Sequence, residues 1–234
     1  MENWKQKENK ARAIIAQTLV PILIYYVINN AAVICGLSVV QVLGSEATFA
    51  GVSESVWFYT ENIIKMTAMA LGGLAVYPYF KKENLDNDGK PILAKDGFML
   101  IMAGIVLSVG INYLFSITGF MQSNEKYQQV AETQFALPLW LAYIFYGMLS
   151  PIVEETVFRG IVYNSLCRNV GNNVAILGSA LLFGAFHGNM VQMIYASLMG
   201  IFMAYLYQKH QNLLAPILFH GAANAAVYTL TYFF

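Results

Sequence analysis

Residues 12–36 read RAIIAQTLVPILIYYVINNAAVICG, an apolar run whose only charged residue is Arg12 at its start. A helix that crosses a bilayer needs about 20 largely apolar residues, so this run predicts a membrane-spanning helix. The whole chain has the same character, because 58% of its 234 residues are hydrophobic and 11% are charged, against a charged share of roughly 25% in soluble domains. Since backbone groups in lipid must be hydrogen-bonded internally, the sequence predicts an all-α membrane protein.

Six further stretches predict membrane helices, and the polar connections between them are short. The stretch 135–168 is longer than one straight crossing requires, so we expect it to be tilted or broken near Pro151. The predicted architecture is a polytopic transmembrane helical bundle of about seven spans, which forms a single membrane domain over residues 1–234. The predicted spans after the first are 62–80, 97–119, 135–168, 172–187, 191–207 and 213–234.

The positions of the basic residues predict the orientation of the chain. Cytoplasmic connections of membrane proteins are enriched in Lys and Arg, and the N-terminal arm is basic whereas the connection 36–62 has no basic residue. The same alternation continues along the chain, so we expect a cytoplasmic N-terminus. Acidic and basic residues balance at 13 each, which gives no net charge to attract nucleic acid. The basic residues of the predicted inner connections are Lys5, Lys7, Lys10, Arg12, Lys81, Lys82, Lys90, Lys95, Arg168 and Lys209.

Two adjacent glutamates stand in the fourth apolar stretch, where residues 151–160 read PIVEETVFRG. An ionisable side chain at membrane depth costs roughly 2.5 to 3.5 kcal/mol on insertion scales, so its presence indicates a function. Glu155 and Arg159 share one face of a helix, with the acid N-terminal to the base, which is the favourable order for an ion pair. Glu154 is rotated by about 100 degrees from Glu155. We therefore expect Glu155 to pair with Arg159, and Glu154 to face the bundle interior as a general base. A helix-end salt bridge is the alternative, but it needs only one acid.

Two histidines and an asparagine lie in later apolar stretches. His187 is in the sequence FGAFHG at 183–188, and His220 and Asn224 are in FHGAAN at 219–224. His220 and Asn224 are four residues apart and so point the same way from one helix. Histidine with glutamate can activate water directly, or can ligate zinc beside an open water position. The residues leave both possibilities open: the cofactor is either zinc, held among Glu154, His187 and His220, or none.

Together these three elements resemble the CPBP family, the CAAX proteases and bacteriocin-processing enzymes that are also called Abi proteins. The family pattern is Glu-Glu-x-x-x-Arg, then Phe-x-x-x-His, then His-x-x-x-Asn, all on membrane helices. The resemblance covers a core of about 139–234, whereas the residues before it resemble the family only in being hydrophobic helices. The pattern falls at Glu154, Glu155, Arg159, Phe183, His187, His220 and Asn224.

The resemblance implies an intramembrane endopeptidase, glutamate-dependent or a metalloprotease, that acts in CAAX-type or in leader- or bacteriocin-type processing. It implies that Glu154 and His187 activate water and that His220 and Asn224 stabilise the oxyanion. Glu155, Arg159 and Phe183 then support the site. The expected surroundings are the bilayer of a bacterial cell membrane, with a membrane-embedded or lipidated peptide as substrate.

Two other functions are compatible with these residues. A non-catalytic bacteriocin-immunity or partner-binding protein would keep the scaffold, but the complete set of motif residues gives no sign of a dead site. A proton-coupled transporter would relay protons through buried Glu and His. Transporters commonly consist of paired repeats, and the sequence has none, so the peptidase interpretation is favoured over both.

Overall fold

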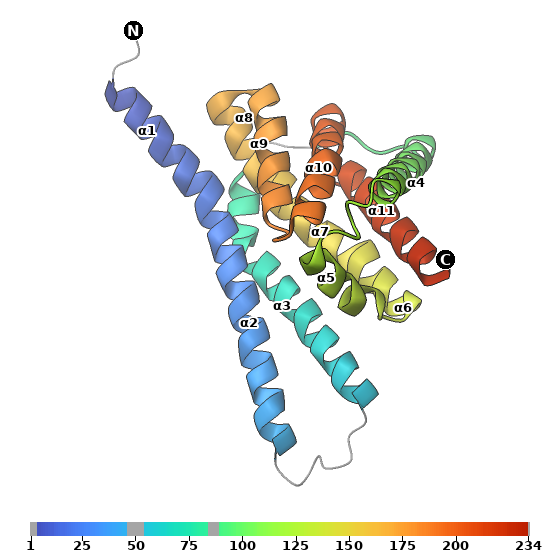
Figure 1. Ribbon diagram of the computed structural model, residues 1–234. Coiled ribbons are helices and arrows are strands. Elements are labelled where there is room, and N and C mark those ends of the chain that lie inside the picture. The colour runs from blue at the N-terminus through green and yellow to red at the C-terminus, as the bar shows by residue number, and fades with distance from the viewer. Residues whose placement is uncertain (1–3, 46–53, 84–88, 234) are drawn as a thin grey trace.

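The computed structural model describes residues 4–45, 54–83 and 89–233, and over these residues all regular secondary structure is helical. Helices α1 (Trp4–Ile14) and α2 (Val20–Ser45), joined by the π-helical η1 (Ile15–Leu19), form one long arm. The next helix, α3 (Glu54–Glu83), lies along α2, and the remaining helices gather on one side of this pair (Figure 1). The predicted all-α fold is confirmed.

Four helical segments among the described residues are long and apolar enough to cross a membrane, namely Glu8–Val42, Val56–Glu83, Ala94–Ile117 and Met190–His210. A fifth crossing is obtained if Glu125–Phe135 and Leu139–Val170 count as one broken span. These helices identify a multi-pass integral membrane protein, as predicted. The count of seven spans and the cytoplasmic N-terminus stay predictions.

The first two membrane helices are longer than the sequence pattern predicted. The predicted boundary at Gly36 falls inside α2, which continues to Ser45, and α3 begins at Glu54 rather than at 62. Residues 46–53 of the predicted connection lie outside the described part of the chain. A Cβ atom at Gly36 would come within 2.7 Å of the Ile64 side chain. Gly36 therefore lets α2 and α3 approach closely and does not end the helix.

The fourth predicted span begins later than expected and is not broken at Pro151. Helix α5 (Glu125–Phe135) ends before Pro138, and the axis then bends by 109° into the segment Leu139–Val170. This segment is helical throughout, so the prediction of a break near Pro151 was wrong; the sharp bend is at Pro138. It consists of α6 (Leu139–Ala142), η3 (Tyr143–Leu149), α7 (Ser150–Glu155), η4 (Thr156–Tyr163) and α8 (Asn164–Val170).

The π-helical segment η3 explains how Pro151 is accommodated. A π-helical stretch widens the helix and changes its hydrogen-bond pattern, and Pro151 follows this stretch directly, as the second residue of α7. The helix can therefore continue through the proline, but no N–H from residue 151 is available to the carbonyl groups four and five residues earlier, those of Gly147 and Tyr146.

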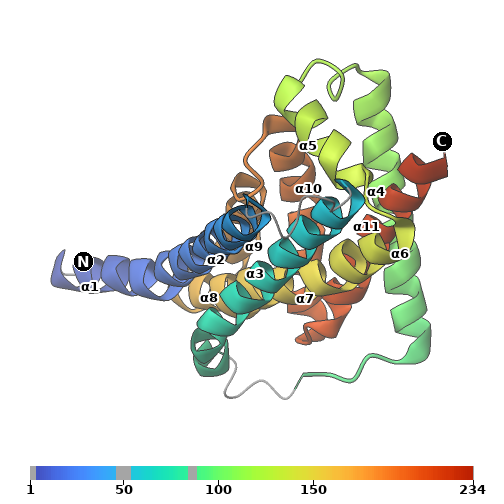
Figure 2. The same ribbon diagram turned by 90° about the horizontal axis from the view of Figure 1, so that it is seen from below.

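The segment α7–η4 lies in the middle of the bundle. Seen from below, it runs between the α2–α3 pair and the α4–α11 pair (Figure 2). Four of its apolar side chains are fully buried, as expected of a helix that is covered on all sides. They are Val157, Phe158, Ile161 and Val162. The other helices are α4 (Ala94–Ile117), α9 (Asn172–Ala185), α10 (Met190–His210) and α11 (Leu214–Phe233).

Glycines allow α9 and α11 to bring their histidines close to this central segment. A Cβ atom at Gly221, beside His220, would overlap the carbonyl oxygen of Gly147 in η3. A Cβ atom at Gly184, in the turn before His187, would overlap the Ser197 side chain on α10. Small residues at these two crossings are therefore required for the observed helix spacing.

Candidate active site

Glu155 and Arg159 form a buried ion pair at the centre of the bundle. Both side chains are 0% exposed, and the Arg159 Nη1 atom donates to the Glu155 Oε1 atom over 2.8 Å. The Arg159 Nη2 atom donates to the carbonyl oxygen of Gly200 on α10 over 3.1 Å. The structure thus contains the ion pair that the four-residue spacing predicted, and it fixes the central segment to α10.

His220 contacts both glutamates. Its Nδ1 atom lies 2.8 Å from Glu155 Oε1, and its Nε2 atom lies 3.7 Å from Glu154 Oε2. Because Glu155 is flanked by Arg159, its oxygen is the acceptor and the His220 Nδ1–H is the donor. This arrangement directs Nε2 of the imidazole toward Glu154. The sequence analysis paired Glu155 with Arg159 alone and did not predict its contact with His220.

Glu154 is oriented by a serine on its own helix. The Ser150 hydroxyl donates to Glu154 Oε1 over 2.6 Å, and both residues are buried. The second carboxylate oxygen, Oε2, lies toward His220. Ser150 was missed in the sequence, although its position four residues before Glu154 places the two on one helix face.

His187 lies in the turn that follows α9. Its Nδ1 atom is 2.9 Å from the carbonyl oxygen of Phe183. A carbonyl can only accept, so Nδ1 carries the proton and Nε2 of the neutral ring is an acceptor.

Phe183 contacts three of the polar residues through its ring. The ring packs edge-on against His187 at 4.8 Å and against His220 at 5.7 Å between centroids, and Arg159 Cζ lies 4.7 Å from the ring centroid. These edge-on and cation–π contacts are favourable. Phe183 thus contacts Arg159 and both histidines and helps to fix their orientation.

Asn224 donates from Nδ2 to the carbonyl oxygen of Tyr146 over 2.9 Å. This carbonyl is one of the two that Pro151 leaves without its N–H. Pro151 therefore affects the site, although it does not break the helix: it leaves an acceptor in η3 that fixes the Asn224 amide. The amide NH₂ group has a second N–H, which is available to donate to another acceptor. This hydrogen bond joins two helical segments that are far apart in the sequence, so no local sequence pattern predicts it.

A cavity of about 260 Å³ brings the predicted site residues together. The four residues predicted to be catalytic, from three separate helical regions, all line it, whereas Glu155 and Arg159 lie behind its wall. Most of the remaining lining side chains are apolar. The residues of the sequence motifs that line the cavity are Glu154, Phe183, His187, His220 and Asn224.

Glutamate and histidine are donor types that zinc accepts, so the placement of these side chains is the feature that bears on a zinc centre. Among the described residues there is no group of three or more His, Cys, Asp or Glu side chains placed to hold a metal ion. The His187 Nδ1 and His220 Nδ1 atoms bond to Phe183 and Glu155, as in histidines that ligate a metal through Nε2, so these two bonds do not argue against a metal. A three-ligand zinc site from Glu154, His187 and His220 would require these side chains to rearrange.

Comparisons with known proteins agree with the predicted family resemblance. Residues 136–226 match the family model described as Type II CAAX prenyl endopeptidase Rce1-like, which confirms the resemblance predicted from the sequence. A relative from Bacillus subtilis (strain 168), named "Putative membrane peptidase YdiL", is 26% identical over 172 residues, covering 71% of this chain and 69% of the relative. No solved structure matches the chain.

Proposed function

Because residues 136–226 match the Rce1-like family, we propose that the chain is an intramembrane endopeptidase that hydrolyses a peptide bond in a membrane-embedded or lipidated peptide. One observation carries this proposal: Glu154, His187, His220 and Asn224 come from three helical regions and line one cavity. The name of the Bacillus relative supports the same class of reaction.

Glu154 and His187 are the groups that activate water. Each offers an acceptor at the cavity, the carboxylate oxygen of Glu154 and the Nε2 atom of His187. The water oxygen attacks the carbonyl carbon of the substrate while its proton passes to Glu154, and the carbonyl electron pair moves onto the carbonyl oxygen. The same proton is then delivered to the amide nitrogen as the C–N bond breaks. Proton transfer by a positioned side chain contributes about 10² to 10⁴ in rate.

His220 and Asn224 stabilise the oxyanion. The free N–H of the Asn224 amide donates to the negative oxygen, and the His220 ring donates from Nε2 when it is protonated. Donors that are already fixed before the reaction need no reorganisation as charge develops. The bonds of Asn224 to Tyr146 and of His220 to Glu155 provide this fixation.

Glu155, Arg159 and Phe183 support the site from behind. Glu155 holds His220, Arg159 balances the charge of Glu155, and Phe183 packs against both histidines. None of the proposed steps requires a metal ion.

The proposal is tested by comparing membrane peptides from cells that express the native chain, Glu154→Gln or His187→Ala at equal levels. We expect a set of peptides that only the native chain produces. Matched controls are Glu132→Gln, on the exposed side of α5, and His210→Ala, at the end of α10. Identical peptide sets from the native chain and both site variants would contradict the proposal and favour a non-catalytic partner-binding protein.

A further inference from the structure

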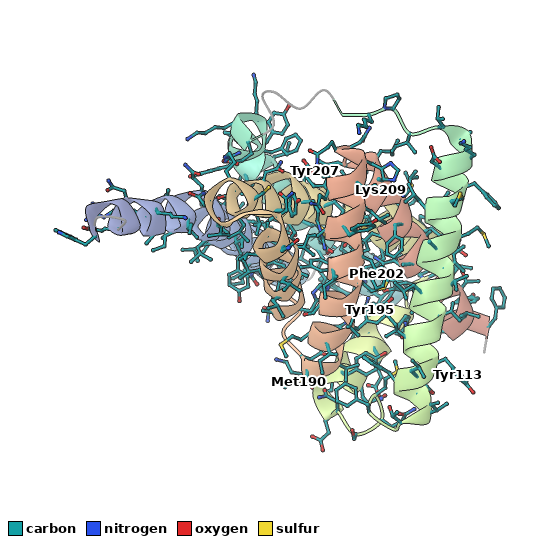
Figure 3. The ribbon with its side chains drawn as sticks, turned by 90° about the horizontal axis from the view of Figure 1, so that it is seen from above. Tyr113, Met190, Tyr195, Phe202, Tyr207 and Lys209 are labelled. Carbon is teal, nitrogen blue, oxygen red and sulfur yellow. The ribbon has the colours of Figure 1, made fainter. Side chains whose placement is uncertain are left out.

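The cavity has a second polar region, made of residues outside the motifs. Its lining includes three side-chain amides, Asn112 on α4, Gln134 on α5 and Gln192 on α10, which we call the amide wall. Tyr195 also lines this region and lies beside Asn112, on the side of α10 that faces α4 (Figure 3). Asn112 and Gln134 precede residues 136–226, so the family match gives them no role.

Two members of the amide wall, Gln134 and Gln192, are held in place by bonds at the start of α10. The Gln192 Nε2 atom donates to Gln134 Oε1 over 3.4 Å, and Asn189 Nδ2 donates to Gln192 Oε1 over 2.6 Å. Asn189 is itself the N-cap of α10, because its Oδ1 atom accepts from the Gln192 backbone N–H over 2.9 Å. The cap therefore fixes both the helix end and the side chain that faces the cavity.

Gln134 is also joined to the proposed catalytic region. The Tyr228 hydroxyl donates to the Gln134 carbonyl oxygen over 3.4 Å, and the Tyr228 ring stacks on Tyr146 at 4.8 Å between centroids. Tyr146 is the residue whose carbonyl oxygen accepts from Asn224. Gln134 of the amide wall and Asn224, one of the two predicted oxyanion donors, thus belong to one connected framework around the cavity.

The charge of the cavity limits what it can bind. Among the described residues that line it, Glu154 is the only acid, and there is no Lys or Arg. The nearby Arg159 is fully buried behind Phe183 and pairs with Glu155. Lys126, on α5, donates to the Gly188 carbonyl oxygen and does not line the cavity. A carboxylate placed inside would be desolvated without a cation, which is costly.

Part of the cavity lining is apolar and adaptable. Met69, Met121, Val130, Met199 and Met203 belong to this part. Methionine side chains are flexible and accept apolar groups of different shapes. Uncharged amides offer both donors and acceptors, so the amide wall suits a peptide backbone or a neutral polar side chain.

Resting on the proposed function, we propose that the amide wall is a substrate subsite that binds an uncharged polar group beside the scissile bond. The group is a main-chain amide or an Asn, Gln, Ser or Thr side chain of the substrate. The subsite therefore rejects a free C-terminal carboxylate or an acidic side chain at this position of the substrate.

The test uses the purified full chain in lipid nanodiscs with a random peptide library, in which every peptide is present with a free and with an amidated C-terminus. Mass spectrometry of the products gives the cleavage sites. The variant is Gln134→Leu combined with Gln192→Leu, and the matched control is Gln129→Leu, an exposed position on the same helix α5. Products from Glu154→Gln define the background.

We expect the native chain to cut internal bonds, to favour neutral polar residues at one position, and to disfavour Asp and Glu there. The double variant loses this preference about tenfold, the factor expected for one or two lost hydrogen bonds, and the control keeps it. An unchanged preference in the double variant, or faster cleavage next to a free carboxylate, would contradict the proposal that the amide wall is a substrate subsite. Products that persist in Glu154→Gln count instead against the proposed function, so the two failures are distinguishable.

Discussion

His220 Nδ1 lies 2.8 Å from Glu155 Oε1, the same oxygen that accepts a hydrogen bond from Arg159. One buried carboxylate oxygen thus connects a proposed oxyanion donor to a buried cation. Glu154, the neighbouring glutamate, lies instead on the cavity wall and bonds to Ser150. The two adjacent acids consequently have different partners, and we expect their variants to differ.

Loss of either member of the Glu155–Arg159 pair should lower the stability of the folded protein. Each of Glu155→Gln and Arg159→Met leaves one buried group uncompensated and is expected to lower the free energy of unfolding by about 3–5 kcal/mol. The double variant should lose clearly less than the sum, because both partners are then neutral. Thermal unfolding in nanodiscs measures this. Additive losses would show that the two side chains are not coupled.

Pro151 and Asn224 should be coupled in stability. Asn224→Ala leaves the Tyr146 carbonyl oxygen without its donor and is expected to cost about 1–3 kcal/mol. Pro151→Ala restores an N–H at residue 151, so the cost of Asn224→Ala should be smaller in the Pro151→Ala background. Peptide cleavage should fall by about 10² to 10³ in Asn224→Ala in either background, because the oxyanion donor is missing.

Equal destabilisation by Asn224→Ala in both backgrounds would contradict this account of Pro151. Asn212→Ala is a matched control, because its side chain bonds to the exposed Lys90 carbonyl oxygen far from the cavity. That variant should leave cleavage unchanged.

Ser150 should act by positioning Glu154. Ser150→Ala removes the hydroxyl that donates to Glu154 Oε1, and we expect the cleavage rate to fall about ten- to a hundredfold through misplacement of the base. Ser150→Thr retains a hydroxyl and should recover most of the rate. The control Ser179→Ala removes another buried hydroxyl, which bonds to the Ile176 carbonyl oxygen, and should keep the rate. A purely structural role for Ser150 would lower stability but leave the rate per folded molecule unchanged.

Chelation distinguishes the two chemistries that the sequence left open. Since no described group of side chains fits a metal ion, we expect cleavage by the purified chain to survive exhaustive treatment with a chelator. Added zinc should not raise the rate. Loss of activity that zinc restores would require Glu154, His187 and His220 to rearrange into a metal site.

Much of the site could be predicted because ionisable residues are rare in apolar helices. Glu154, Glu155 and His220 stood out for this reason, and the helical period separated the roles of the two acids. The contact of Asn224 with the Tyr146 carbonyl oxygen could not be predicted, because it depends on which helices cross. Gln134 and Gln192 could not be distinguished from other polar residues in the sequence, because only the packing of α5 beside α10 brings them together at the cavity.

The errors in the predicted helix bounds have local causes. Gly36 resembles a helix end in sequence, yet the close approach of Ile64 explains why a glycine is required inside α2. Pro151 resembles a break, but the widened helix of η3 accommodates it. The sharp bend is at Pro138 instead. In each case the surrounding structure, and not the residue type alone, determines whether the helix ends or bends at that residue.

The most direct test of the central claim, that Glu154 is the base that activates water, is the rate of peptide cleavage by the purified Glu154→Gln variant in nanodiscs. The variant keeps the shape of the side chain and its bond to Ser150, so we expect normal thermal unfolding together with a loss of about 10² to 10⁴ in rate. A folded Glu154→Gln variant that cleaves at the native rate would contradict the claim.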